Sequence, residues 1–432
     1  MRGRRWLPAL LLLGCTARPP PGSDAWLIAE GRRFIERTDA RRTALEASLT
    51  NHDNQYSKLR LGAYALEHRG WDLLPEWNPR SRPVTASIAA SLERGVIPDR
   101  DAEPLWDGRT PSTAAEWVAL GERVFFGYPM RAEVFLEHGM TRRALVDAVG
   151  IERTASGDTP GLVVFRDVDG AHRVGITCAI CHASVKAGAT VAGHARRSFD
   201  YGRLRLAYFE ATGEPLDPGL KRRMESWGPG RADVTEDDDE DPVAIPDLWG
   251  LRAQSFLTQA GTIRHDSPLA LAIRQETQLT DSNHQRVRPP RVLVWALVMY
   301  LYALEPPARA ASAPSIAGKK LFAAHCASCH DNAAHGGQPI AAAKIGTDPA
   351  LANGRGRGTG RYRPAPLVRV SEGAPYLHDG AVTSLVELLS PGRFAPDYRG
   401  GRWRPGPIPG HRAGTELSAG DRADLIAFLE TF

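Results

Sequence analysis

The stretches CAICH at residues 178–182 and CASCH at residues 326–330 decide how this chain of 432 residues folds. In each stretch two thiols stand one helical turn apart and a histidine follows directly. At this spacing both thiols can attach to vinyl groups of one haem while the imidazole binds the iron. The pattern predicts two covalently bound haem c groups, with His182 and His330 as proximal iron ligands. The expected attachment residues are Cys178 and Cys181 for the first haem, and Cys326 and Cys329 for the second.

Two other uses of paired cysteines fit the sequence less well. A zinc site would need two further ligands for each pair, and a thioredoxin-like pair does not need a histidine next in line. The fifth cysteine, Cys15, lies near the N-terminus, so none is left for a structural disulfide. Because haem is attached to such motifs outside the cytoplasm, the prediction also requires an exported chain.

The first residues have the order of a secretion signal. Three arginines stand among the first five residues, an apolar run follows at residues 6–13, and a small-residue processing site ends it. The ending Leu-x-Gly-Cys resembles a bacterial lipobox, which implies cleavage before Cys15 and a lipid on its sulfur. Thr16 in place of aspartate gives no signal for inner-membrane retention. We therefore expect a periplasmic lipoprotein anchored in the outer membrane; the alternative is an ordinary signal with an incidental cysteine.

The composition is that of a water-soluble globular protein. Charged residues make up 24% and hydrophobic residues 42% of the chain, and no stretch approaches the roughly 18 apolar residues that span a bilayer. The net charge of +4 is spread along the chain without interleaved aromatic residues, so we expect no nucleic acid partner. The composition does not indicate an oligomeric state.

Helical patterns and proline-rich stretches divide the chain. The predicted fold is mainly α, with a helical N-terminal extension plus two cytochrome c-like domains and little strand. The expected segments are a lipoprotein-type signal peptide at residues 1–15, a tether at 16–23, the extension at 24–111, a first haem c domain at 112–305, a linker at 306–314 and a second haem c domain at 315–432.

The second haem domain shows a helix pair known from small cytochromes. There, an N-terminal helix that carries a glycine and an aromatic residue crosses the C-terminal helix beside the haem. Gly318, Phe322 and Phe428 match this arrangement, and Ser418 is the expected N-cap of the last helix. The Gly/Arg-rich segment at residues 354–363 is expected to be a loop.

The sixth ligand decides the use of each iron. Methionine favours a carrier of higher potential, histidine one of lower potential, and an open position a site for substrate. No methionine follows Met299, so the second haem has only histidines downstream. Its candidates are His335, His378 and His411.

For the first haem more alternatives remain. Met224, His194, His265, His284 and an open position all fit, since each residue lies downstream within loop distance. Met224 stands at about the separation at which small cytochromes place their axial methionine. A methionine on a helix, however, is more often part of the core.

Two stretches around His378 are YRPAPL at residues 362–367 and PYLHDG at 375–380. They resemble the second-haem domain of the di-haem cytochrome c peroxidase superfamily. Within that superfamily the segment is most similar to the rubber-oxygenase-like branch, where a Pro-Gly to Gly-His loop supplies a histidine ligand; PGPIPGH at 405–411 is similar. The resemblance implies that His411 is the sixth ligand of the second haem, that His378 is structural, and that Arg363 contacts a haem propionate.

The resemblance covers roughly residues 248–432 and weakens towards the N-terminus. IPDLWGLR at residues 245–252 is similar to the segment that precedes the distal residues of the first haem in the peroxidases. Where those enzymes carry Leu-Glu-Glu-Gln, this chain has LALA at residues 269–272, so the expected catalytic acid is missing. Only Gln275 and Glu276, about a turn later, could substitute, and we expect them at an exposed helix end.

An acidic run at residues 236–241 is a candidate Ca²⁺ site through its carboxylates. It lacks the spacing and the glycine of a folded calcium loop. A solvated acidic loop is the simpler interpretation.

These features favour an exported di-haem c-type cytochrome that transfers single electrons between redox partners, namely small redox proteins or mediators. The alternative is a di-haem peroxidase or oxygenase-like enzyme that uses the first haem for peroxide or O₂ chemistry. A peroxidase needs an acid or base over the iron. Because that group is missing, we predict no catalytic residue.

Overall fold

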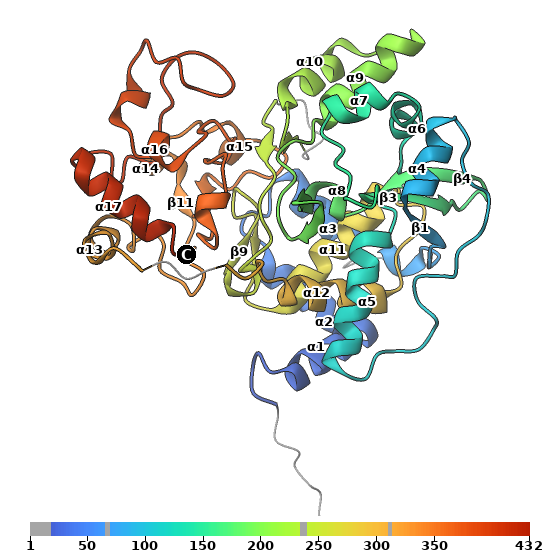
Figure 1. Cartoon of the computed structure of the whole chain (residues 1–432). Coiled ribbons are helices and arrows are strands. Elements are labelled where there is room, and N and C mark those ends of the chain that lie inside the picture. Colours follow the sequence, from blue (N-terminus) through green and yellow to red (C-terminus); the bar gives the residue numbers. More distant parts are fainter. Residues whose placement is uncertain (1–18, 65–69, 234–239, 310–312) are drawn as a thin grey trace, which may run out of the picture.

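The structure is a computed structural model that describes residues 19–64, 70–233, 240–309 and 313–432. Within these ranges the chain forms seventeen α-helices and twelve strands, most of them short, which confirms the predicted mainly α fold. Figure 1 shows a larger body, coloured blue to yellow, and a smaller body in orange and red that contains the C-terminal part of the chain.

The larger body contains the elements up to α12. Its helices are α1 (Asp24–Glu36), α2 (Thr38–Ser48), α3 (Gln55–Ala63), α4 (Ala86–Glu93), α5 (Ala114–Gly127), α6 (Val134–Met140), α7 (Arg143–Ala148), α8 (Ala179–His182), α9 (Tyr201–Thr212), α10 (Pro218–Trp227), α11 (Pro268–Ser282) and α12 (Arg291–Ala303). Its strands are β1 (Ser81–Val84), β2 (Arg131–Ala132), β3 (Thr159–Arg166), β4 (His172–Ile176), β5 (Ala183–Lys186), β6 (Ala189–Ala192), β7 (Arg231–Ala232), β8 (Val243–Ala244), β9 (Phe256–Leu257) and β10 (Ile263–Arg264).

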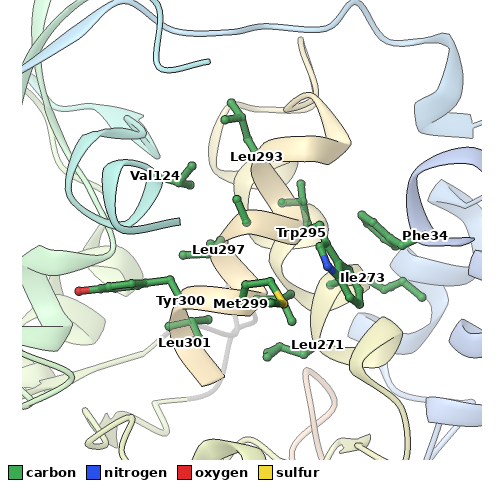
Figure 2. Close-up of a cluster of buried hydrophobic side chains, with 14 of the residues drawn as sticks. Phe34, Val124, Leu271, Ile273, Leu293, Trp295, Leu297, Met299, Tyr300 and Leu301 are labelled. Atoms are coloured by element: carbon green, nitrogen blue, oxygen red, sulfur yellow. The ribbon is translucent and has the colours of Figure 1, made fainter. Parts of the chain in front are cut away.

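The core of the larger body is built around α12. Its residues 291–301 are all buried, as expected for a helix that is apolar on every side. α5 packs closely against it, because a side chain at Gly121 would meet the carbonyl oxygen of Ala296 at 2.0 Å. Figure 2 shows Trp295 of α12 facing Phe34 of α1, with the ring centroids 5.9 Å apart.

The N-terminal extension shares this core. Leu27, Phe34 and Leu45 belong to the same apolar cluster as Trp295, and α1 and α2 contact α12 and α11. The boundary expected after residue 111 therefore does not divide the core. Residues 24–64 and the central region form one packed unit.

An antiparallel sheet of four strands, in the order β1-β3-β4-β2, is the largest strand element among the described residues. Leu162 to Phe165 of β3 are all buried. A continuous apolar run has no alternation, so its period does not distinguish a strand from a buried helix. β4 leads directly into the first Cys-x-x-Cys-His motif, which the sheet therefore positions.

α3 connects the extension to the smaller body. The backbone N–H groups of Gln55 and Tyr56, at the start of α3, donate to the carbonyl oxygens of Arg355 and Gly356, each at 3.0 Å. The side chain of Asn54 donates to the carbonyl oxygen of Gly358 at 3.1 Å. The glycine- and arginine-rich segment thus has a defined place against the first helices.

The smaller body is built on two crossing helices. Its elements are α13 (Ile316–His325), β11 (Ile340–Ala341), α14 (Ala342–Ile345), α15 (Ala350–Asn353), β12 (Arg361–Tyr362), α16 (Leu385–Leu388) and α17 (Ala419–Leu429).

The crossing of α13 and α17 depends on a glycine. A side chain at Gly318 would meet the carbonyl oxygen of Asp424 at 2.1 Å. Beside the crossing, Phe322 and Phe428 pack with ring centroids 5.6 Å apart, and the side chain of Ser418 caps α17. The predicted helix pair is confirmed.

In the part of the chain that the structure describes, no helix combines the length and the apolar character needed to cross a bilayer.

We expect Gly318→Ala to destabilise the haem-loaded protein. The added methyl group would overlap a backbone carbonyl of α17, which cannot move away as a flexible side chain could. Such overpacking typically costs about 1–3 kcal/mol and would lower the midpoint of thermal or denaturant unfolding. Gly420→Ala in α17 is the matched control, because its nearest atom lies at 3.9 Å and alanine favours helix. Native stability of Gly318→Ala would contradict the close approach.

Candidate haem sites

The second Cys-x-x-Cys-His motif begins at the C-terminal end of α13, where Cys326 is the C-cap. The Nδ1 of His330 lies 2.6 Å from the carbonyl oxygen of His335. Because a carbonyl can only accept, Nδ1 carries the proton and Nε2 is left as the ligand atom. Burial lowers the pKa of His330, which keeps the imidazole neutral, as iron ligation requires.

A cavity of about 470 Å³ lies against this motif. Cys326, Cys329 and His330 line it together with mostly apolar side chains, a composition typical of cofactor sites. The residues present therefore fit a haem attached at the two thiols. The apolar lining includes Phe322, Leu367, Leu385, Leu388, Leu425 and Leu429.

His411 lines the same cavity from the loop at residues 405–411. Arg393 is fully buried and holds this loop, because its guanidinium donates to three of the loop's carbonyl oxygens at 2.5, 2.6 and 2.9 Å. Burial, together with the charges of the nearby His330 and Arg393, lowers the pKa of His411 to about 4. Two neutral imidazoles, those of His330 and His411, thus line one cavity.

The two other histidines of this region are placed differently. His378 also lines the cavity, with its ring centroid 4.4 Å from that of Tyr362, and burial lowers its pKa. His335 stacks on Phe432 at 4.2 Å with the ring planes 7° apart, and it is not among the residues that line the cavity. The geometry therefore favours His411 and His378 over His335.

Arg363 lines the cavity as well. Its Nε donates to the carbonyl oxygen of Thr258 at 3.0 Å, and its Nη1 donates to Oε1 of Gln254 at 3.1 Å. Burial lowers its pKa to about 10, so the guanidinium remains charged at neutral pH. This placement fits the predicted role of a propionate partner.

The first motif forms α8, which packs tightly on β3. Gly161 makes this possible, because it has φ +92° and a side chain there would meet the backbone N of Ile180 at 2.3 Å. The Nδ1 of His182 lies 3.1 Å from the carbonyl oxygen of Pro246. Burial lowers the pKa of His182 to about 4. Both motifs thus present a neutral imidazole in the same tautomer.

Burial opposes thiolate formation at three of the four motif cysteines. Burial raises the pKa of Cys178 to about 11, of Cys181 to about 12 and of Cys326 to about 11, whereas redox and zinc sites use thiolates. Among the described residues, no group of three or more His, Cys, Asp or Glu side chains is placed to hold a metal ion.

The methionine that contacts the first motif is Met130, which sequence analysis missed. Its sulfur lies 3.9 Å from the sulfur of Cys178. Met224 is buried in α10, and its carbonyl oxygen packs against Gly202 of α9. Among the described residues, no contact connects Met224 with His182. The role of Met224 as sixth ligand of the first haem stays a prediction.

The three histidines considered as sixth ligand of the first haem are either hydrogen-bonded to protein groups or exposed. His265 uses both ring nitrogens, Nδ1 at 2.7 Å from a backbone carbonyl and Nε2 at 2.6 Å from a tyrosine hydroxyl. The Nδ1 of His194 lies 2.7 Å from a serine hydroxyl. His284 is exposed. These contacts favour a methionine or an open position over a histidine.

The expectation that Gln275 and Glu276 lie at an exposed helix end is wrong. Both are buried in α11, because the N-terminal helices cover this face. Glu276 accepts a hydrogen bond from the hydroxyl of Tyr64 and lies 3.1 Å from Nε of Arg291. A carboxylate held in this way is not free to serve as a catalytic acid.

The segment at residues 244–249 touches both sites. Pro246, whose carbonyl lies against His182, also lines the cavity of the second motif. Trp249 lines that cavity too and belongs to the apolar cluster against which Cys178 packs. The two sites are therefore connected through one short stretch of chain.

The C-terminal part of the chain matches a known protein family. Residues 315–432 match the family model of cytochrome c. This part of the chain is similar to cytochrome c. The match contains both thiols and the histidine of the second motif, and it supports covalently bound haem c and a haem-based role in electron transfer. None of the curated proteins matches the chain.

Two predicted features lie wholly or largely outside the described residues. Cys15 belongs to residues 1–18, and most of the acidic run belongs to residues 234–239. Of that run, Glu240 lies 3.6 Å from Nε of Arg222. Lipid attachment and calcium binding stay predictions.

Arg393 is a further site residue that sequence analysis missed. It contacts no cofactor position itself but fixes the loop that carries His411. The carbonyl groups that it binds lie fifteen to eighteen residues further along the chain. No local pattern distinguishes it from the many surface arginines of this sequence.

We expect Arg393→Ala to release the loop at residues 405–411. The variant leaves buried carbonyl groups without their charged donor, a loss of about 3 kcal/mol in the free energy of unfolding. Thermal unfolding should shift down, and trypsin should cut the folded protein faster after the exposed Arg412. Arg404→Ala removes an exposed arginine directly before this loop and serves as control. Equal cleavage and stability in both variants would show that Arg393 does not hold the loop.

Proposed function

We propose that this protein is an exported di-haem c-type cytochrome that transfers single electrons between small redox proteins or mediators. The observation that carries the proposal is the double contact of Pro246. Its carbonyl lies against the proximal histidine candidate of the first haem, and the residue also lines the cavity of the second. A bound haem supplies the one-electron chemistry, and the chain's residues position it and set its potential.

At each site the chain's own residues would hold the haem by the same means. Cys178 and Cys181 would form the thioether bonds of the first haem, and Cys326 and Cys329 those of the second. The hydrogen bond from Nδ1 to a backbone carbonyl fixes each imidazole plane and makes Nε2 more basic. Arg363 would lie beside a propionate of the second haem.

His411 is the sixth ligand in this proposal for the second haem. It lines the cavity together with His330, its imidazole is neutral, and Arg393 fixes the loop from which it comes. Met224 or an open position remains for the first haem. Ligation by two histidines would give the second haem the lower potential expected of such carriers.

The enzyme alternative is supported less well. The one carboxylate near the expected position, Glu276, is bound by Tyr64 and Arg291. Without a free acid or base, assistance of roughly two to four orders of magnitude in rate is missing. Export, the lipid on Cys15 and the anchor in the outer membrane are part of the proposal on the strength of the leader sequence.

The proposal is tested on the mature, purified protein. Its mass should exceed that of the processed polypeptide by two haems, and both haems should reduce and reoxidise rapidly with small mediators. Mixing the half-reduced protein with stoichiometric peroxide should leave the Soret band unchanged on the millisecond scale in a stopped-flow instrument. Free haem and the Glu276→Gln variant are the controls. A fast change that the Glu276→Gln variant loses would establish the enzyme alternative.

We expect His411→Ala to convert one haem from low-spin to high-spin and to leave the other unchanged, because the second iron loses its sixth ligand. Electron paramagnetic resonance and the visible spectrum report the spin states. His378→Ala is the matched control, since this histidine lines the same cavity. The opposite result, with only His378→Ala changing the spin state, would make His378 the ligand.

A further inference from the structure

Arg60 is a buried charge in the N-terminal extension. It lies on α3 with 0% of its surface exposed, and Nε, Nη1 and Nη2 have no hydrogen-bond partner within the described part of the chain. A guanidinium stays charged in proteins, and burying a charge without a counter-charge is strongly unfavourable. An anion bound beside Arg60 would remove this unfavourable term.

Two more arginines gather at the same place. The Cζ atoms of Arg60 and Arg357 each lie 4.5 Å from the ring centroid of Tyr56. Burial lowers the pKa of both guanidiniums, and the charge of Arg274 on α11 lowers both further. The carboxylate of Asp281 opposes this effect at Arg357. Two guanidiniums thus flank one tyrosine, and the charge of Arg274 acts on both.

The cluster is assembled from three separate parts of the sequence. Arg60 and Tyr56 come from α3, Arg274 from α11, and Arg357 from the segment on which the start of α3 docks. The hydrogen bonds from Gln55 and Tyr56 to the carbonyl oxygens of residues 355 and 356 hold the start of α3 against the segment that carries Arg357. The fold therefore keeps like charges close, against their repulsion.

The cluster lies near the first motif. Tyr56, which the guanidiniums of Arg60 and Arg357 flank, and Cys178 pack against the same apolar cluster. Residues 269–273 of α11, directly before Arg274, belong to that cluster as well. Figure 1 shows α3, α8 and α11 in the same part of the larger body.

We propose that Arg60, Arg274 and Arg357 bind the propionate carboxylates of the haem attached at Cys178 and Cys181. This inference rests on the proposed function, because it requires the first haem. Thioether bonds hold one edge of a haem, and the two propionates extend from another, so a second set of contacts has to receive them. Planar guanidiniums bind carboxylates through paired charge-assisted hydrogen bonds. The N-terminal extension would then complete the first haem site.

The test replaces Arg60 by methionine, which removes the charge and keeps an apolar side chain of similar length. In the Arg60→Met holoprotein, the midpoint potential of one haem should fall, because a positive charge near the propionates favours the reduced iron. The other potential should stay unchanged, and thermal unfolding should shift to lower temperature. Arg32→Met, which changes an exposed arginine on α1, should alter neither quantity. Arg274→Gln, at a half-buried position, is the second variant if Arg60→Met does not fold.

Three outcomes would overturn the assignment. An unpaired Arg60 would make Arg60→Met more stable than the native protein, with both potentials unchanged. A diffusible oxyanion in the site would make the native protein, but not Arg60→Met, respond to added inorganic phosphate or acetate in its unfolding temperature. A mass with a haem at the second motif only would overturn the proposed function and this inference together, whereas two haems with unchanged potentials would overturn this inference alone.

Discussion

The hydrogen bond from a histidine Nδ1 to a backbone carbonyl is the interaction on which both sites depend. It sets the direction of Nε2 and thereby the plane in which a haem must lie. In the second motif the carbonyl comes from His335, only five residues beyond His330. In the first it comes from Pro246, sixty-four residues beyond His182. The second site is thus oriented by its own turn, whereas the first is oriented only when the central region has packed.

This difference explains what the sequence could predict. The spacing of two thiols and a histidine is local, so both motifs could be found without the fold. The crossing of α13 and α17 could also be predicted, because Gly318 and its aromatic neighbours match a known arrangement. The family match begins in the same part of the chain, where the contacts are local.

The features that could not be predicted depend on contacts between distant parts of the chain. Glu276 is buried because Tyr64 of the N-terminal extension and Arg291 of α12 both pack against it. The apolar run of β3 carries no alternation, because it is buried on both sides. Nothing in the local sequence distinguishes Arg393 and Arg60 from surface arginines. Both are buried only because distant parts of the chain pack around them. The sixth ligand of the first haem stays open for the same reason, since no local spacing selects it.

The docking of α3 on residues 355–358 has a consequence for the order in which the molecule assembles. The hydrogen bonds from Asn51 and Asn54 to Gly358 span 307 and 304 residues of sequence. Contacts of such high separation carry a large loop-closure entropy and form late. The C-terminal domain can close on its own nearby contacts, whereas α3 can dock only once residues 355–358 are in place. α3, although synthesised early, is therefore among the last parts of the chain to reach its final position.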